Sequence, residues 1–210
     1  MDKRNVVKKT YKLFIGGEFP RSESARTYNL INGEGDVICH VAQASKKDLR
    51  NAVIAARSAS SQWVSCSPFL RSQILYRIAE MLESRFVQFV QELTAEGVSP
   101  EEAAREAKEA VELVVHYAGW ADKYQPLFSS VNPVSSPHQC ISTVEQIGVV
   151  AVVAPEESGL LGLLAALLPA MVGGNSCVVL SSHMMPMSAI TLAEVLATSD
   201  VPAGVVNILT

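Results

Sequence analysis

Cysteine is scarce in this chain, and no two cysteines have the spacing of a metal site or a redox pair. There are four among 210 residues, and two of them lie inside apolar runs, which is typical of a free buried thiol. The spacing argues against a disulfide framework and against a zinc site, so we expect no bound metal. The four are Cys39, Cys66, Cys140 and Cys177.

Charged residues are also few, and no basic patch stands out. They make up 18% of the chain, and the formal net charge is −4. Proteins that bind the phosphate backbone of nucleic acids carry clustered lysine and arginine instead. The one basic run, at the N-terminus, fits a solvated arm. We therefore expect no nucleic-acid partner.

Long apolar segments are missing as well. Residues 1–15 lack the apolar stretch of a secretory signal peptide. The most apolar run, residues 159–174, falls short of the ~20 residues that a membrane-spanning helix needs. Because 49% of the residues are hydrophobic, the chain can still bury a sizeable core. We expect a cytoplasmic protein without a membrane partner.

The first 44 residues have the pattern of a small β layer. Residues 11–19 alternate imperfectly around a Gly-Gly pair, and residues 32–35 (Asn-Gly-Glu-Gly) form a second turn between β-prone flanks. Glycine tolerates the positive φ angles that such turns require. The sequence predicts an N-terminal β-hairpin layer over residues 1–44.

Residues 45–137 have helical patterns. Ser45 and Asp48 have capping-box spacing, and Leu49, Val53 and Ala56 then fall on one helical face. Apolar residues recur at spacings of three and four over residues 70–93, which predicts one amphipathic helix ended by Gly97. A further helix starts clearly, with Ser99 as N-cap, Pro100 in the first turn and Glu102 three residues after the cap.

Residues 138–210 alternate between β and α patterns, after a Pro- and Ser-rich connection at residues 125–138. The alternation predicts a parallel sheet with right-handed crossovers. The predicted strands are 140–148, 149–155, 176–182 and 205–210, and the predicted helices are 160–171 and 188–198. The fold class is therefore α/β: a β-hairpin layer and long helices, then the first half of a Rossmann-like parallel sheet, all within one domain.

Two of these elements should be deeply buried. Residues 149–155 are apolar throughout, which predicts a strand buried on both faces. The helix over residues 160–171 is apolar all round, so it should be covered on every side, and Pro169 should kink or end it.

The turn after the strand 149–155 is the usual ligand crevice of such a sheet, and it contains Glu156 and Glu157. No GxGxxG or Walker sequence is present. One interpretation makes the two glutamates an acid/base pair with separated pKa values. We favour the other, in which both are acids at a helix N-terminus, stabilised by the macrodipole.

The histidines and methionines near the predicted sites have simpler explanations than catalysis. His183, at the end of the strand 176–182, could act as a base or a ligand anchor, but no Ser/His/Asp set accompanies it. His116 lies on a helix beside Tyr117, where packing explains it. Met184, Met185 and Met187 fit adaptable core or interface positions.

Several strings together resemble the aldehyde dehydrogenase superfamily, specifically the N-terminal part of its NAD-binding domain. The resemblance covers nearly the whole chain, from about residue 11 to residue 210. It rests on FIGGE (14–18), YAGWADKY (117–124), GV (148–149), LLPA followed by GN (167–175) and VPAGVVNILT (201–210). The YAGWADKY string and the spacing from PA to GN are the most specific.

The resemblance fails at the positions that carry the family's chemistry. Active members end the first sheet strand in Pro-Trp-Asn, and the Asn donates to the oxyanion; here Pro155, Glu156 and Glu157 stand there. A carboxylate cannot donate unless protonated, and it opposes a developing negative charge. The next strand ends in Lys-Pro-Ser-Glu, whose Lys and Glu hold the adenosine ribose; here Leu180 and His183 replace them.

The resemblance thus implies a cofactor position without its polar groups. The family positions near NAD are Val153, Pro155, Glu156, Leu180, Ser182 and His183, and we expect NAD binding to be weak or absent. The general base and the nucleophilic cysteine of the family have no counterpart in residues 1–210. The pattern is similar to the degenerate second domain of family 16 aldehyde dehydrogenases, or to a bacterial relative.

Two functions remain open. The first is a catalytically inactive segment with a structural or oligomerisation role, which packs against aldehyde-dehydrogenase-like domains or against itself. The second is the N-terminal portion of an active NAD(P)-dependent aldehyde oxidoreductase whose catalytic half lies outside this chain. Residues 140–148 resemble the strand that active members use in oligomer assembly.

Overall fold

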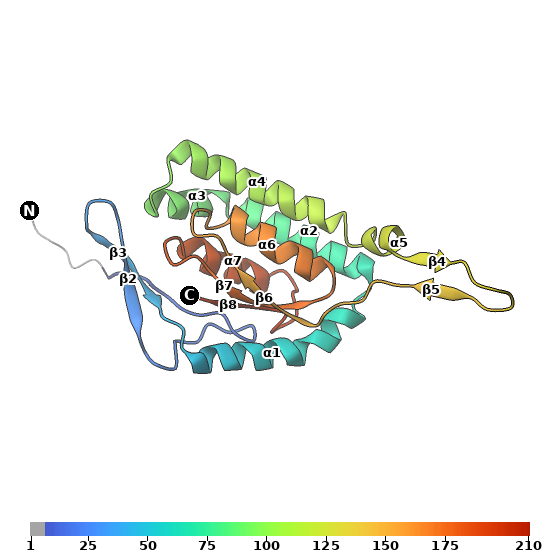
Figure 1. Ribbon diagram of the computed structural model, residues 1–210. Coiled ribbons are helices and arrows are strands. Elements are labelled where there is room, and N and C mark those ends of the chain that lie inside the picture. Colours follow the sequence, from blue (N-terminus) through green and yellow to red (C-terminus); the bar gives the residue numbers. More distant parts are fainter. Residues whose placement is uncertain (1–6) are drawn as a thin grey trace, which may run out of the picture.

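A computed structural model describes residues 7–210 (Figure 1). The N-terminal layer contains β1 (Thr10–Tyr11), β2 (Thr27–Ile31) and β3 (Val37–Ala42), in the order β1-β3-β2. β2 and β3 are antiparallel, and the predicted turn at Asn32 joins them, so the hairpin is confirmed. Phe14 pairs with Ile208 and thereby ties this layer to the outer edge of the second sheet.

The first helix, α1 (Lys46–Ser65), begins as predicted but buries a different face. Ser45 and Asp48 form the capping box, with Asp48 N–H donating to Ser45 Oγ at 3.2 Å. Of the residues predicted to share one face, Ala56 is buried, whereas Leu49 is 48% exposed. Small residues and one tryptophan are buried instead, since α1 packs closely against the sheet; they are Ala52, Ala56, Ala59 and Trp63.

The single helix predicted over residues 70–93 is wrong, because Arg85 divides it into two. α2 (Pro68–Ser84) ends and α3 (Phe86–Ala95) begins on either side of this residue, whose φ and ψ are −105° and 15°. Its guanidinium Nη1 donates to Glu194 Oε2 at 2.7 Å. The break lets α2 pack on α4 (Pro100–Ala118) while α3 also contacts α7 (Met187–Ala197). The predicted Ser99 cap of α4 is confirmed by Glu102 N–H, 3.3 Å from Ser99 Oγ.

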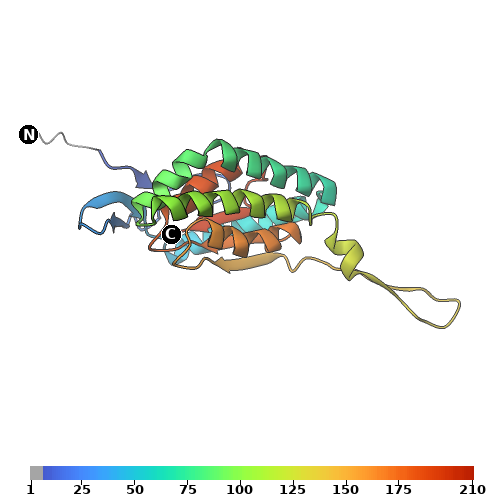
Figure 2. The same ribbon diagram turned by 90° about the horizontal axis from the view of Figure 1, so that it is seen from above.

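A narrow hairpin projects from one end of the body (Figures 1 and 2). It follows the short helix α5 (Tyr124–Phe128) and pairs β4 (Ser130–Asn132) with β5 (Cys140–Ser142). The predicted strand over residues 140–148 is therefore wrong beyond Ser142, because the residues that follow find no strand partner within residues 7–210.

The second sheet confirms the predicted parallel βαβαβ unit. Its strands β6 (Val149–Val153), β7 (Ser176–Leu180) and β8 (Val206–Leu209) are parallel and lie in that order. α1 packs on one face of this sheet, and α6 (Leu161–Val172) and α7 cover the other. The protein is thus a mixed α/β fold. None of the helices in residues 7–210 is long and apolar enough to cross a bilayer.

Burial of β6 and α6 is less complete than predicted. β6 is not buried on both faces: Ala151 and Val153 are exposed, Val153 at 71%, because α1 covers β6 less than it covers β7 and β8. α6 exposes Ala165 and Ala166, where α4 and the sheet leave it uncovered. The helix also continues through Pro169 to Val172 instead of ending there.

Candidate functional site

The site lies at the carboxyl ends of β6 and β7. Residues 154–157 follow β6, and residues 181–184 follow β7. Ala154 N–H donates to Leu180 O at 2.9 Å, so the two segments stay paired to the point where they leave the sheet. In open parallel sheets this end of the strands is where ligands bind.

Glu156 binds the loop that follows β7. Its Oε2 accepts hydrogen bonds from Ser182 Oγ at 2.8 Å, His183 N–H at 2.9 Å and Met184 N–H at 3.2 Å. These donors hold the pKa of Glu156 below its usual range. Both interpretations of Glu156 made from the sequence are therefore wrong: it neither pairs with Glu157 nor binds the N-terminus of α6.

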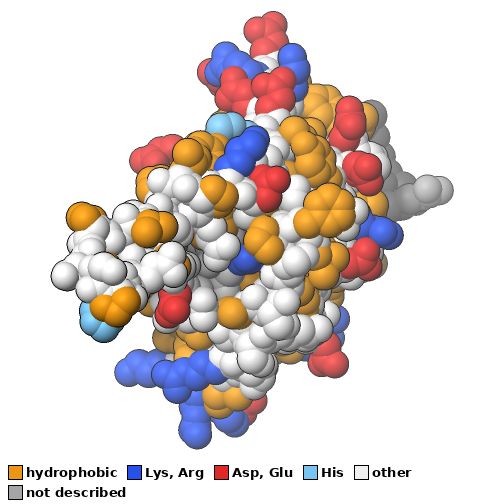
Figure 3. All heavy atoms as spheres, turned by 90° about the vertical axis from the view of Figure 1, so that its right-hand side faces the viewer, with side chains coloured by type: hydrophobic (Ala, Val, Ile, Leu, Met, Phe, Trp, Pro, Cys, Tyr) orange, Lys and Arg blue, Asp and Glu red, His pale blue; other side chains and the backbone are white. Residues whose placement is uncertain are grey.

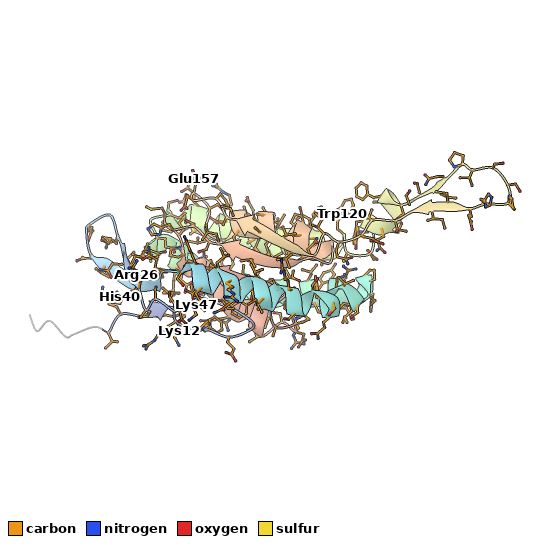
Figure 4. The ribbon with its side chains drawn as sticks, turned by 60° about the horizontal axis from the view of Figure 1, so that its bottom comes forward. Lys12, Arg26, His40, Lys47, Trp120 and Glu157 are labelled. Carbon is orange, nitrogen blue, oxygen red and sulfur yellow. The ribbon has the colours of Figure 1, made fainter. Side chains whose placement is uncertain are left out.

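The N-terminus of α6 is bound by an acid that the sequence did not indicate. Glu106, on α4, accepts from the N–H groups of Leu160 and Leu161 at 3.0 Å each, and from Ser158 Oγ at 2.9 Å. Glu157 instead points outward (Figure 4) and lines a surface groove with Glu106 and Arg105. The macrodipole partner is thus Glu106, which no local signal near residue 157 could have revealed.

Leu180 and His183 have structural surroundings that differ from a ribose site. Leu180 is 48% exposed and lines an apolar groove with Val153 and Leu49. The His183 ring stacks on Tyr28 with centroids 4.2 Å apart, and Tyr28 Oη donates to His183 O at 3.3 Å. His183 therefore ties the loop to the N-terminal layer.

No nucleophile is evident near these residues. Burial raises the pKa of the Cys39 thiol to about 11 and that of Cys177 to about 12, so neither is a reactive thiolate. Within residues 7–210 no group of three or more His, Cys, Asp and Glu side chains could hold a metal ion. His116 is exposed on α4, where its ring lies edge-on to Tyr117 and accepts from Trp120 Nε1 at 3.0 Å.

The sequence reasoning missed two glutamates of the α3 segment: Glu92, which is buried in the helix, and Glu96, the partly buried residue that caps its C-terminus. Glu92 Oε1 accepts from Thr191 Oγ1 at 2.9 Å and Tyr11 Oη at 3.1 Å, while its Oε2 is buried without a partner. One turn later, Glu96 Oε1 accepts from Met187 N–H at 2.7 Å, and its Oε2 is also buried and unpartnered. These carboxyl groups join α3 to α7 and β1. Their helical positions look like ordinary surface glutamates in the sequence.

We expect the free energy of unfolding to fall as the pH rises from about 4.5 to about 8 because of Glu96. Burial raises the pKa of this carboxyl to about 8, so the folded chain keeps a proton that the unfolded chain releases in this window. The stabilisation is complete below the unfolded pKa and is lost as the pH passes the folded one. A single such proton gives a slope of up to about 1.4 kcal/mol per pH unit.

Urea unfolding at several pH values measures this slope. Glu96→Gln should flatten it, whereas Glu83→Gln, at an exposed position of α2, should leave it unchanged. An unchanged slope in Glu96→Gln would contradict the assignment.

The profile of the aldehyde dehydrogenase family matches residues 19–210. Cytosolic 10-formyltetrahydrofolate dehydrogenase of Mus musculus is 30% identical over 213 residues, which cover 99% of this chain and 24% of the mouse protein. DhaS of Bacillus subtilis is 31% identical over 95% of this chain and 41% of its own length. The NAD+ complex of aldehyde dehydrogenase from Bacillus cereus superposes with a TM-score of 0.91 at 26% identity, covering 96% of this chain and 41% of that one.

The chain therefore belongs to the aldehyde dehydrogenase family, which confirms the resemblance seen in the sequence. It spans less than half the length of these relatives. The finer likeness to family 16 stays a prediction.

The residues at the strand ends do not fit the NAD that the family implies. Leu180 offers no hydrogen bond to a ribose hydroxyl. The hydroxyl and amide donors of the β7–α7 loop are already bound by the Glu156 carboxylate. The Glu156 carboxylate also places a negative charge at this end of the strands, and like charges repel.

Proposed function

We propose that this chain is a catalytically inactive aldehyde-dehydrogenase-like segment with a structural role. Its partner would be an aldehyde-dehydrogenase-like domain or a second copy of the chain. The observation that carries the structural role is the outer edge of β6, which pairs with no strand of residues 7–210.

The topology indicates what belongs at that edge. The order β8-β7-β6 corresponds to strands 3-2-1 of a doubly wound sheet, in which the fourth strand pairs with the first. The edge of β6 therefore supports docking of a strand from another segment. Such a strand would pair with the backbone N–H and C=O groups along this edge. An unpaired edge is otherwise a template for self-association.

The chemistry of the strand ends supports the absence of catalysis. Glu157 stands where the family resemblance places an oxyanion donor, and an ionised carboxylate accepts hydrogen bonds only. Removing one such donor lowers the rate by ~10²–10³ in a well-studied protease. A carboxylate in its place would add repulsion to that loss.

The projecting hairpin supports a second contact surface. Large apolar side chains are exposed on it and on α5, and hydrophobic atoms are spread over this end of the molecule (Figure 3). They include Leu127, Phe128, Val131 and Ile141, all at least 58% exposed. Exposed apolar area of this kind commonly marks an interaction site.

Lysine at the β6 edge tests the proposal. We expect Val153→Lys to weaken association of the purified chain about tenfold or more, because a charged side chain blocks strand pairing. Val87→Lys is the matched control, since Val87 is an equally accessible valine on α3, at 66% exposure. Sedimentation velocity over a concentration series measures both. A wild-type chain that stays monomeric at tens of micromolar and also fails to bind an aldehyde-dehydrogenase-like partner would refute the proposal.

The alternative function is the N-terminal portion of an active NAD(P)-dependent oxidoreductase. It is favoured by the structural likeness to an NAD+ complex of a Bacillus enzyme. Co-expression with the part of DhaS that lies beyond its matched region separates the two. NADH formation by the reconstituted pair, abolished by a substitution in this chain, would favour the enzyme; a stable but inactive complex would favour the structural role.

A further inference from the structure

The β7–α7 loop directs three hydrogen-bond donors at one oxygen atom. Ser182 Oγ, His183 N–H and Met184 N–H all lie within 3.2 Å of Glu156 Oε2. Ser182 Oγ is also 3.1 Å from Glu156 O, and Met184 N–H is 3.1 Å from Ser182 Oγ, so only His183 N–H has this carboxylate as its single acceptor. Convergent N–H groups of successive residues form an anion-binding concavity. The loop therefore has the donors of an oxyanion site, and a side chain of the same molecule fills it.

Contacts on its other sides hold the loop in this shape. Ser182 is buried, and its Oγ accepts from Met185 N–H at 2.9 Å. Tyr28 stacks on the His183 ring and donates to its carbonyl oxygen. These contacts do not involve the Glu156 carboxylate, so the donors should stay convergent when that carboxylate is removed.

We propose that the β7–α7 loop is an oxyanion-binding site that Glu156 occupies as an internal ligand, closing the crevice end of the sheet. Without the Glu156 side chain, the same donors would accept an external carboxylate or phosphate. An internal carboxylate acts at an effective concentration of the order of millimolar or higher, so a weakly bound external anion cannot displace it. This inference depends only on the loop geometry, and it stands whether or not the chain associates with a partner.

Glu156→Ala and Glu157→Ala form a matched pair of test variants. Both remove a carboxylate from adjacent positions, but only Glu156 bonds to the loop. Hydrogen exchange of the His183 amide should be about tenfold faster or more in Glu156→Ala, because its charge-assisted hydrogen bond is lost. Exchange of the Met184 amide should rise less, because Ser182 Oγ remains as its acceptor. Glu157→Ala should match the wild type.

Anion titrations then test whether the emptied loop binds a ligand. Sodium acetate and inorganic phosphate are added separately to amide-labelled protein, with sodium chloride at equal ionic strength as reference. We expect saturable shifts of the His183 and Met184 amide signals in Glu156→Ala and none in the wild type or Glu157→Ala. Saturation by acetate alone would identify a carboxylate site. Saturation by both acetate and phosphate would identify a general oxyanion site.

A third variant separates loss of the carboxylate charge from disruption of the loop. Glu156→Gln keeps an acceptor oxygen without the charge, so exchange at His183 and Met184 should be intermediate between the wild type and Glu156→Ala. If exchange in both Glu156 variants equals that in Glu157→Ala, or if neither anion gives a saturable shift in a folded Glu156→Ala chain, the proposal is overturned.

Discussion

Mixed with NAD and acetaldehyde, the purified chain is expected to form no NADH. The family positions for the oxyanion donor and the ribose hold Glu157, Leu180 and His183, and residues 1–210 offer no counterpart of the nucleophile or general base. The buried thiols of Cys39 and Cys177 have raised pKa values, so they cannot replace the nucleophilic cysteine of the family. NADH formation is measured by the absorbance of the reduced nicotinamide, followed over hours at a high concentration of the chain.

The aldehyde dehydrogenase from Bacillus cereus is a suitable positive control, because its fold matches this chain with a TM-score of 0.91. Slow turnover can also come from a trace contaminant. NADH formation therefore contradicts the prediction only if one substitution in this chain, such as Glu157→Ala, changes its rate while the contaminating activity is excluded by repurification.

Replacement of Trp63 by alanine is expected to lower the free energy of unfolding by about 3–5 kcal/mol. The Trp63 side chain is fully buried, and its Nε1 donates to Met171 O at 3.0 Å, where α6 ends. The alanine variant leaves a cavity and removes the hydrogen bond from α1 to Met171 O, which keeps its bond from Gly174 N–H. Trp63→Phe keeps most of the ring but not the hydrogen bond, so it should cost less.

The second tryptophan of the chain supplies the comparison. Trp120 is half-buried, and its Nε1 bonds to His116 on the surface of α4. Trp120→Ala should cost clearly less than Trp63→Ala when both are measured by urea unfolding. Equal costs would show that Trp63 does not anchor α1 to α6.

Features that depend on neighbouring residues could be predicted from the sequence. The capping box at Ser45 and the N-cap at Ser99 are formed by residues three positions apart, and both are present. The parallel order of β6, β7 and β8 follows from the alternation of apolar strands and helices, because such units cross over with one hand.

Features that depend on residues far apart in the chain could not be predicted from the sequence. The break at Arg85 goes together with an ion pair to Glu194, which lies on α7, and the apolar periodicity continues across it. The partner of the α6 N-terminus is Glu106 on another helix, and the partner of Glu156 is a loop 26–28 residues later. Burial of Glu92 and Glu96 likewise depends on the packing of α7 and β1 against α3.

Calorimetric titration of the purified chain with NAD tests the central claim most directly, because the claim is that this family segment has lost its cofactor contacts. The Bacillus cereus enzyme, known in complex with NAD+, serves as the positive control. We expect no saturable heat from the chain up to millimolar NAD, under conditions in which the control binds. A saturable isotherm with micromolar affinity would contradict the account and would favour the active oxidoreductase.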